Sequence, residues 1–187
     1  MSLESSEKKF ISKQELWNKS AAEIDSVRDR LGKEVDSGIR ETIIALCALG
    51  FKTTGSCEGH LDHGLKGPWV DFGYYPPEIS EKRRVAVRTN QPLDPQAERV
   101  ISEISRELQE EQLQLISLLS EFYEHRNVPF DERIILEFHG QDRTRILSQG
   151  VEIQHARVSS EQEQKLQKYK KEMKEFTEFL TRKFFGS

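Results

Sequence analysis

Two long stretches of helical periodicity constrain the fold more than any other feature of the sequence. Residues 95–126 carry apolar side chains on a seven-residue repeat, and residues 159–184 carry them at the spacing of one helix face. Pro95 stands at the start of the first stretch, where its fixed φ suits the first helical turn. Because helices of this length are stabilised mainly by burying one face, we expect the two to pack together as an antiparallel pair.

The remaining elements are shorter and lie on both sides of the first long helix. Ser12 and Glu15 form a capping-box pattern that predicts an N-terminal helix. A second helix is expected over residues 36–49, with Asp36 or Ser37 as its cap. Short runs with strand character cover residues 51–57, 69–75, 85–89, 134–139 and 143–148. This order predicts an α+β fold in which a small, mostly antiparallel sheet packs against long helices.

The length of 187 residues suits one domain with a hydrophobic core. We therefore expect a single α+β domain over residues 1–187, with an N-terminal helical arm at 1–35 and a C-terminal long helix at 159–187. Hydrophobic residues make up 35% of the chain and charged residues 32%, a balance typical of long exposed helices. We also predict a homodimer, formed through this helix pair or through its exposed face.

Composition also excludes several classes of protein. No apolar run is long enough to span a membrane, and the polar N-terminus lacks the apolar segment of a signal peptide. With Cys47 and Cys57 as its two cysteines, the chain has no disulfide scaffold, and we expect a cytoplasmic protein without membrane contact. A net charge of -4 gives no global basic surface, so the composition does not favour nucleic acid as a partner.

Chemically reactive side chains are concentrated in residues 53–73, the expected strand-loop-strand. This segment contains Cys57, Glu58, His60, Asp62, His63 and Asp71. Glycines are interleaved with them, and glycine allows a ligand to approach the backbone closely. Loops that follow a strand end are common places for binding and catalytic sites. We therefore expect the functional site in this segment.

A metal site is the first interpretation of the segment. Cys57, His60 and His63 are spaced three and three, and thiolate and imidazole are ligands that zinc prefers. Asp62 or Asp71 is available as a fourth ligand. The spacing matches no standard zinc-finger pattern, and a polar loop whose histidines face solvent would also explain it. Zinc is therefore one candidate cofactor, and a polar loop without a metal is the alternative.

Catalysis is a second interpretation, with Cys57, Glu58 and His60 as the candidate catalytic residues. Cys57 is a candidate nucleophile that either His60 or the distant His139 would activate. Glu58 is a candidate base if a bound metal keeps a water molecule. A small buried thiol that packs like a hydrophobic side chain would explain the cysteine equally well. Whether the chain is an enzyme stays open.

A third interpretation is a cradle for a small anionic or nucleotide-like molecule. Successive backbone N–H groups in residues 54–59 can form a nest for phosphate or carboxylate, while arginine supplies charge and an aromatic ring supplies a stacking face. Two simpler explanations stay open. The arginines in residues 83–88 would also suit a solvated strand edge, and the aromatic rings in residues 69–75 would also suit the hydrophobic core. The ligand-binding candidates are Thr54, Ser56, Trp69, Asp71 and Arg88.

Two resemblances bear on the run TTGSCEGH at residues 53–60. It resembles a Ser-Cys-Glu-Gly-His motif, followed by a Pro-Trp-Val strand, of uncharacterised bacterial and phage proteins. It also resembles the Thr-Thr-Ser-Ser-Cys-Ser-Gly-Arg signature of the third-step methyltransferases of tRNA wybutosine synthesis. Gly55, Glu58 and His60 stand where that family has Ser, Ser and Arg. The second resemblance implies methylation of a modified guanosine in tRNA with S-adenosylmethionine.

The sequence therefore predicts a small-ligand or metal-binding protein with its site around Cys57. The alternative is a protein-interaction module in which the helices carry the function and the loop is structural.

Overall fold

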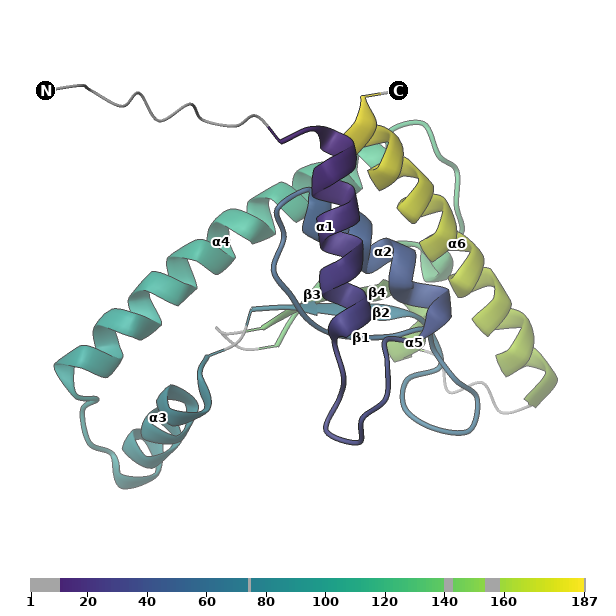
Figure 1. Cartoon of the computed structure of the whole chain (residues 1–187). Coiled ribbons are helices and arrows are strands. Elements are labelled where there is room, and N and C mark those ends of the chain that lie inside the picture. Colours follow the sequence, from purple (N-terminus) through teal and green to yellow (C-terminus); the bar gives the residue numbers. More distant parts are fainter. Residues whose placement is uncertain (1–10, 74, 140–142, 154–158, 187) are drawn as a thin grey trace, which may run out of the picture.

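The computed structural model describes residues 11–73, 75–139, 143–153 and 159–186. It confirms the α+β fold: a four-stranded antiparallel sheet lies against long helices (Figure 1). No helix in these described ranges is both long and apolar enough to cross a membrane. The helices are α1 (Lys13–Ser26), α2 (Ser37–Ala48), α3 (Pro77–Thr89), α4 (Pro95–Tyr123), α5 (Gly150–Ile153) and α6 (Ser159–Phe185), with a short 3-10 helix at Phe130–Glu132.

The sheet has the strand order β1-β2-β4-β3, so β1 and β3 form its edges. The four strands are β1 (Thr53–Cys57), β2 (Trp69–Phe72), β3 (Ile134–Phe138) and β4 (Thr144–Ser148). Alternate residues of the central strands, such as the paired Val70 and Ile146, are fully buried toward the helices. The pairing of β1 with β2 shifts register between Thr53 and Gly55. This irregularity lies directly before the segment in which the reactive side chains gather.

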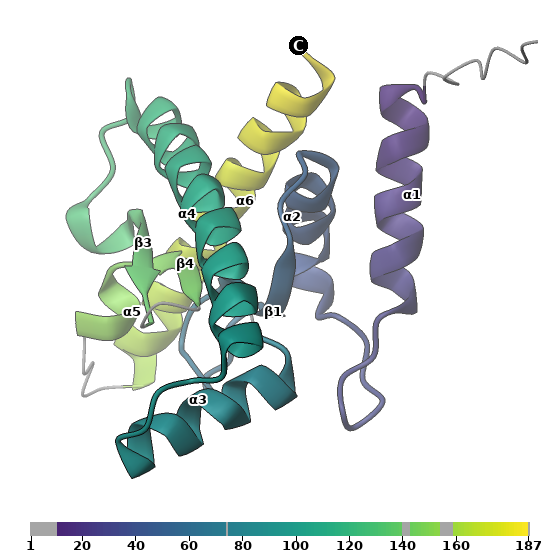
Figure 2. The ribbon, with the colours of Figure 1, turned by 90° about the vertical axis from the view of Figure 1, so that its left-hand side faces the viewer.

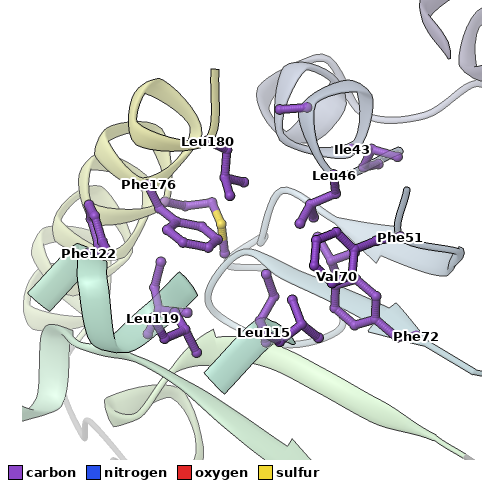
Figure 3. Close-up of a cluster of buried hydrophobic side chains, with 14 of the residues drawn as sticks. Ile43, Leu46, Phe51, Val70, Phe72, Leu115, Leu119, Phe122, Phe176 and Leu180 are labelled. Carbon is purple, nitrogen blue, oxygen red and sulfur yellow. The ribbon is translucent and has the colours of Figure 1, made fainter. Parts of the chain in front are cut away.

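The main core fills the space between the sheet and three helices. Side chains from α2, α4 and α6 meet the apolar face of the sheet there (Figure 3). Its fully buried members include Ile39, Leu46, Val70, Phe72, Leu115, Ile146, Phe176 and Leu180. The core fixes α2 over β1, and these two elements carry the candidate site described below.

The strand expected over residues 85–89 is wrong, because this segment belongs to α3. Pro77 stands in the first turn of that helix, and Ile79 packs with Ala97 of α4 in a second, smaller apolar cluster. Val85 and Val87 suggested a strand through their alternation, but they are 45% and 77% exposed. An alternation of apolar and polar residues over only five positions does not distinguish a strand from an exposed stretch of helix. In Figure 2, α3 lies below α4 at some distance from the sheet.

The expected antiparallel pairing of the two long helices is also wrong. The main helical neighbour of α6 is α2, and the C-terminal ends of α4 and α6 lie at the same end of the molecule (Figure 1). The two helices meet near those ends, where the rings of Phe122 and Phe176 are 5.1 Å apart. A seven-residue repeat shows that a helix has an apolar face but not what covers it. The homodimer stays a prediction, and Leu113 of α4 is 68% exposed.

A polar network joins the end of α4 to α6. The Tyr123 hydroxyl donates to Glu172 at 2.9 Å and accepts the backbone N–H of Ile134 at 2.6 Å. Arg126 lies 2.7 Å from a carboxylate oxygen of Glu172 and 2.7 Å from one of Glu175. Burial raises the pKa of Glu172, whereas the hydrogen bond from Arg126 lowers the pKa of Glu175. The two carboxylates therefore contribute to stability in opposite pH ranges.

We expect Glu172→Gln and Glu175→Gln to change the pH profile of stability in opposite directions. A raised folded-state pKa gives a contribution that is complete below the unfolded-state pKa and is lost as pH rises through the folded-state pKa. Relative to Glu172→Gln, the wild type should therefore lose stability as pH rises. A lowered folded-state pKa gives a contribution that is lost as pH falls, so relative to Glu175→Gln the wild type should lose stability on acidification.

Urea unfolding followed by circular dichroism, between about pH 3 and pH 8, measures both differences. Each variant is the matched control for the other, because both replace a glutamate beside Arg126 with its neutral isostere. Profiles with the same sign of slope would contradict the assignment.

Candidate functional site

The start of α2 and the loop after β1 are tied together by a reciprocal pair of hydrogen bonds. Asp36 is the N-cap residue of α2, but its side chain does not form the capping bond expected from the sequence. Its carboxylate instead accepts the backbone N–H of Glu58 at 3.1 Å. The carboxylate of Glu58 accepts the backbone N–H of Gly38 at 2.7 Å. Each segment thus supplies the acceptor that the other needs, and the loop is held against the helix.

The loop also closes on itself through Gly59. This residue has a φ of +81°, and a Cβ there would lie 2.6 Å from the carbonyl carbon of Gly67. Only glycine fits such an approach in the left-handed region. Beside it, the backbone N–H of His60 donates to the carbonyl of Leu65 at 3.3 Å. These contacts turn the chain back after β1 and place His60 beside Cys57.

Three potential metal ligands converge where these segments meet. One donor atom each from Asp36, Cys57 and His60 lies within 4.8 Å of the other two. His60 Nε2 is 3.4 Å from Asp36 Oδ2, and all three side chains are partly buried. The backbone N–H of Gly59 points at Cys57 Sγ at 3.4 Å. The cluster combines nitrogen, sulfur and oxygen donors from two separate segments of the chain.

The structure divides the three predicted ligands between two groups. Cys57 and His60 lie together with Asp36, whereas His63 belongs to a second group with His60 and Asp62. The rings of His60 and His63 stack 4.3 Å apart, and His63 Nδ1 lies 2.8 Å from Asp62 Oδ1. Asp62 and His63 are exposed, and His63, like His60, lines the cavity beside the first group. The sequence pattern indicated a helix cap at Asp36 and gave no sign of it as a potential metal ligand.

The surroundings of Cys57 keep its thiol protonated. Burial raises the pKa of Cys57, and the charges of Asp36 and Glu58 raise it further. Burial opposes ionisation of Asp36 as well, but hydrogen bonds from Glu58 N–H and His60 outweigh it and lower the pKa of that carboxyl. A thiol with a raised pKa is a poor nucleophile at neutral pH. A bound cation would reverse this effect, because a metal displaces the thiol proton.

A cavity of about 570 Å³ opens beside the cluster. Asp36, Cys57 and His60 line it on one side, together with the whole of β1. Three residues predicted to bind a ligand, Thr54, Ser56 and Trp69, lie in its wall. The opposite wall is the connection between α1 and α2, which contributes Val27, Arg28, Asp29, Lys33, Glu34 and Val35. A cavity of this size is typical of small-molecule sites.

The other predicted residues lie elsewhere. Glu58 follows β1 and extends its carboxylate to the start of α2, where Lys170 Nζ is 3.5 Å from it. Asp71 is buried and accepts two hydrogen bonds from Arg145, at 2.6 and 2.9 Å. Arg88 is exposed on α3, because the expected strand is a helix. Glu58, Asp71 and Arg88 are thus not among the described residues that line the cavity.

Comparison of the chain with known protein families, with curated proteins and with solved structures gives no significant match. The two resemblances of the segment around Cys57 therefore stay predictions.

Proposed function

We propose that the chain binds a divalent transition metal, zinc above all, through Asp36, Cys57 and His60. The convergence of their three donor atoms within 4.8 Å carries the proposal. Donors in a tetrahedral zinc site lie about 3.3–3.6 Å apart, as the known Zn–S, Zn–N and Zn–O distances require. His60 Nε2 and Asp36 Oδ2, at 3.4 Å, already have that separation. Small side-chain rotations would bring all three onto one ion.

The surrounding hydrogen bonds and charges support the same function. The N–H of Glu58 orients the Asp36 carboxylate, and the N–H of Gly59 points at Cys57 Sγ. Outer contacts of this kind orient the ligands of metal sites and strengthen their binding. The carboxylate of Glu58 adds negative charge near the thiol, and a cation would relieve its effect on Cys57. Backbone N–H groups of the loop therefore already orient the side chains of Asp36 and Cys57.

Metal binding is expected to depend on Cys57 and not on the other cysteine. Cys57→Ser should weaken Zn²⁺ binding by more than the 10- to 100-fold that loss of an outer contact causes, because it removes a ligand. Isothermal titration calorimetry against a competing chelator measures the affinity. Replacement of zinc by Co²⁺ should give a sulfur-to-cobalt charge-transfer band that Cys57→Ser abolishes.

Cys47→Ser is the matched control, because Cys47 lies on α2, where its sulfur contacts the Thr53 hydroxyl at 3.6 Å. It should keep both the affinity and the cobalt band. Asp36→Asn should weaken Zn²⁺ binding with little change in volume, and His60→Asn should weaken it by removing the imidazole. If the wild type binds no Zn²⁺, or if none of these site variants weakens binding, the proposal fails.

A further inference from the structure

The geometry points to a small aliphatic carboxylate as a ligand of this site, bound with its carboxylate on the metal and its apolar body in the cavity. This inference rests on the proposed metal site. Three features of the described residues support it: the number of donors, the apolar wall of the cavity and the Lys33 ammonium in the opposite wall. Together they define a coordination position, a hydrophobic compartment and a counter-charge.

The donor set leaves one coordination position open. Within the described ranges, no fourth Asp, Glu, Cys or His joins Asp36, Cys57 and His60 at mutual distances within 4.8 Å. His63, which comes nearest to being a fourth ligand, pairs with Asp62 and stacks on His60 instead. Zinc sites with three protein ligands keep the fourth position for water or an exogenous ligand. All three ligands line the cavity, so that position is reached from it.

Apolar side chains make up a large part of the cavity wall. Ile24 and Val27 come from the end of α1 and the residue after it, and Val35 precedes the metal ligand Asp36. Trp69 of β2 also lines the cavity. An inorganic anion would leave this surface in contact with water, whereas an alkyl chain would cover it. The wall therefore favours an organic anion over phosphate.

Lys33 supplies the counter-charge. Its position is held by a closed turn, in which the Asp29 carboxylate accepts the N–H groups of Leu31 and Lys33 at 2.8 Å each. The nearby Arg28 is engaged by Glu34 at 2.7 Å. The Lys33 ammonium, by contrast, has no ion-pair partner in the described part of the chain. A divalent ion held by one carboxylate and one thiolate is neutral overall, and in the opposite wall Arg28 and Lys33 balance Asp29 and Glu34. Lys33 therefore offers a monoanion a local ion-pair partner, not a net positive charge of the cavity.

Butyrate is the probe, and Trp69 reports its binding. The chain has two tryptophans, so Trp17→Phe leaves Trp69 as the single emitter. In Zn²⁺-loaded Trp17→Phe protein, butyrate should change Trp69 fluorescence to saturation. Acetate should bind roughly tenfold more weakly, because it lacks two methylenes that the apolar wall would bury. In the Co²⁺ form, butyrate should shift the visible bands, whereas phosphate should bind more weakly than butyrate.

Lys33→Met should weaken butyrate binding by up to about fivefold and leave Zn²⁺ affinity unchanged, because it removes an exposed charge and keeps the apolar stem. Arg30→Met is the matched control, since Arg30 is exposed on the same connection and does not line the cavity. If Zn²⁺ binds but butyrate changes neither fluorescence nor the cobalt bands, the open position is refuted and the metal site stands. Equal affinities for acetate, butyrate and phosphate would overturn the assignment of the ligand. Absence of Zn²⁺ binding would instead refute the metal site itself.

Discussion

Gly59→Ala is expected to abolish metal binding and to lower the free energy of unfolding by roughly 2–4 kcal/mol. At the φ of +81° alanine is strained, and its Cβ would lie 2.6 Å from the carbonyl carbon and 2.7 Å from the Cα of Gly67. Both atoms belong to the backbone, so a change of rotamer cannot relieve the clash. The loop has to move, and His60 moves with it. Urea unfolding and Zn²⁺ titration measure the two effects.

Gly64→Ala is the control, because it introduces the backbone strain of a positive φ without a steric clash against another segment. Gly64 has a φ of +63°, but within the described part of the chain a Cβ there would meet no heavy atom within 4 Å beyond the two adjacent residues. Its replacement should cost only about 1–2 kcal/mol, the penalty of the left-handed conformation. Metal binding should persist, since the loop keeps its path. Equal losses in the two variants would show that the contact between Gly59 and Gly67 does not hold the loop.

Asp71→Ala is expected to lower the free energy of unfolding by about 3–5 kcal/mol, because it removes the carboxylate that accepts two hydrogen bonds from the largely buried Arg145 guanidinium. The side chains of Asp71 and Arg145 are 8% and 12% exposed, and two hydrogen bonds join them. The Arg145 guanidinium also lies 4.1 Å from the centre of the Trp69 ring. Chemical unfolding measures the loss. Zn²⁺ affinity should not change, because Asp71 lies outside the cluster of ligands.

A double variant tests the cause of that loss. Asp71→Val with Arg145→Met removes both charges and keeps apolar volume, so it should be much more stable than Asp71→Ala. Instability equal to that of the single variant would assign the effect to packing. A loss below about 1 kcal/mol in Asp71→Ala would show that solvent screens the pair.

The sequence located the segment that carries Cys57 and His60 but not the third member of the cluster of potential metal ligands. Cys57 and His60 are close in sequence, and their chemistry suggested a metal. Asp36 is distant in sequence and lies at a helix start, where an aspartate is normally explained as a cap. Only the packing of α2 over β1 brings its carboxylate to the thiol. The spacing of His63 suggested a shared ion, but ring stacking and Asp62 place it in the second group.

The same distinction between local and tertiary information applies to the fold. Pro95 and the apolar repeat located α4, which begins at Pro95 in the structure. The repeat could not show that α2, and not α4, is the main helical neighbour of α6. Residues 85–89 have local alternation, but α3 buries Ile79 against Ala97 and leaves the valines exposed. Local sequence patterns therefore predict where helices and strands form. Which of these elements pack together depends on contacts between residues that are distant in the sequence.

The position of β1 at the margin of the sheet has a consequence for association between molecules. An unpaired strand margin is a template onto which strands of other chains can add, which leads to aggregation. All five residues of β1 line the cavity, whose far wall is the connection between α1 and α2. The register shift between Thr53 and Gly55 further disturbs the regular pattern that an incoming strand would need. We therefore expect the connection between α1 and α2, together with the register shift, to hinder the addition of a second polypeptide to β1.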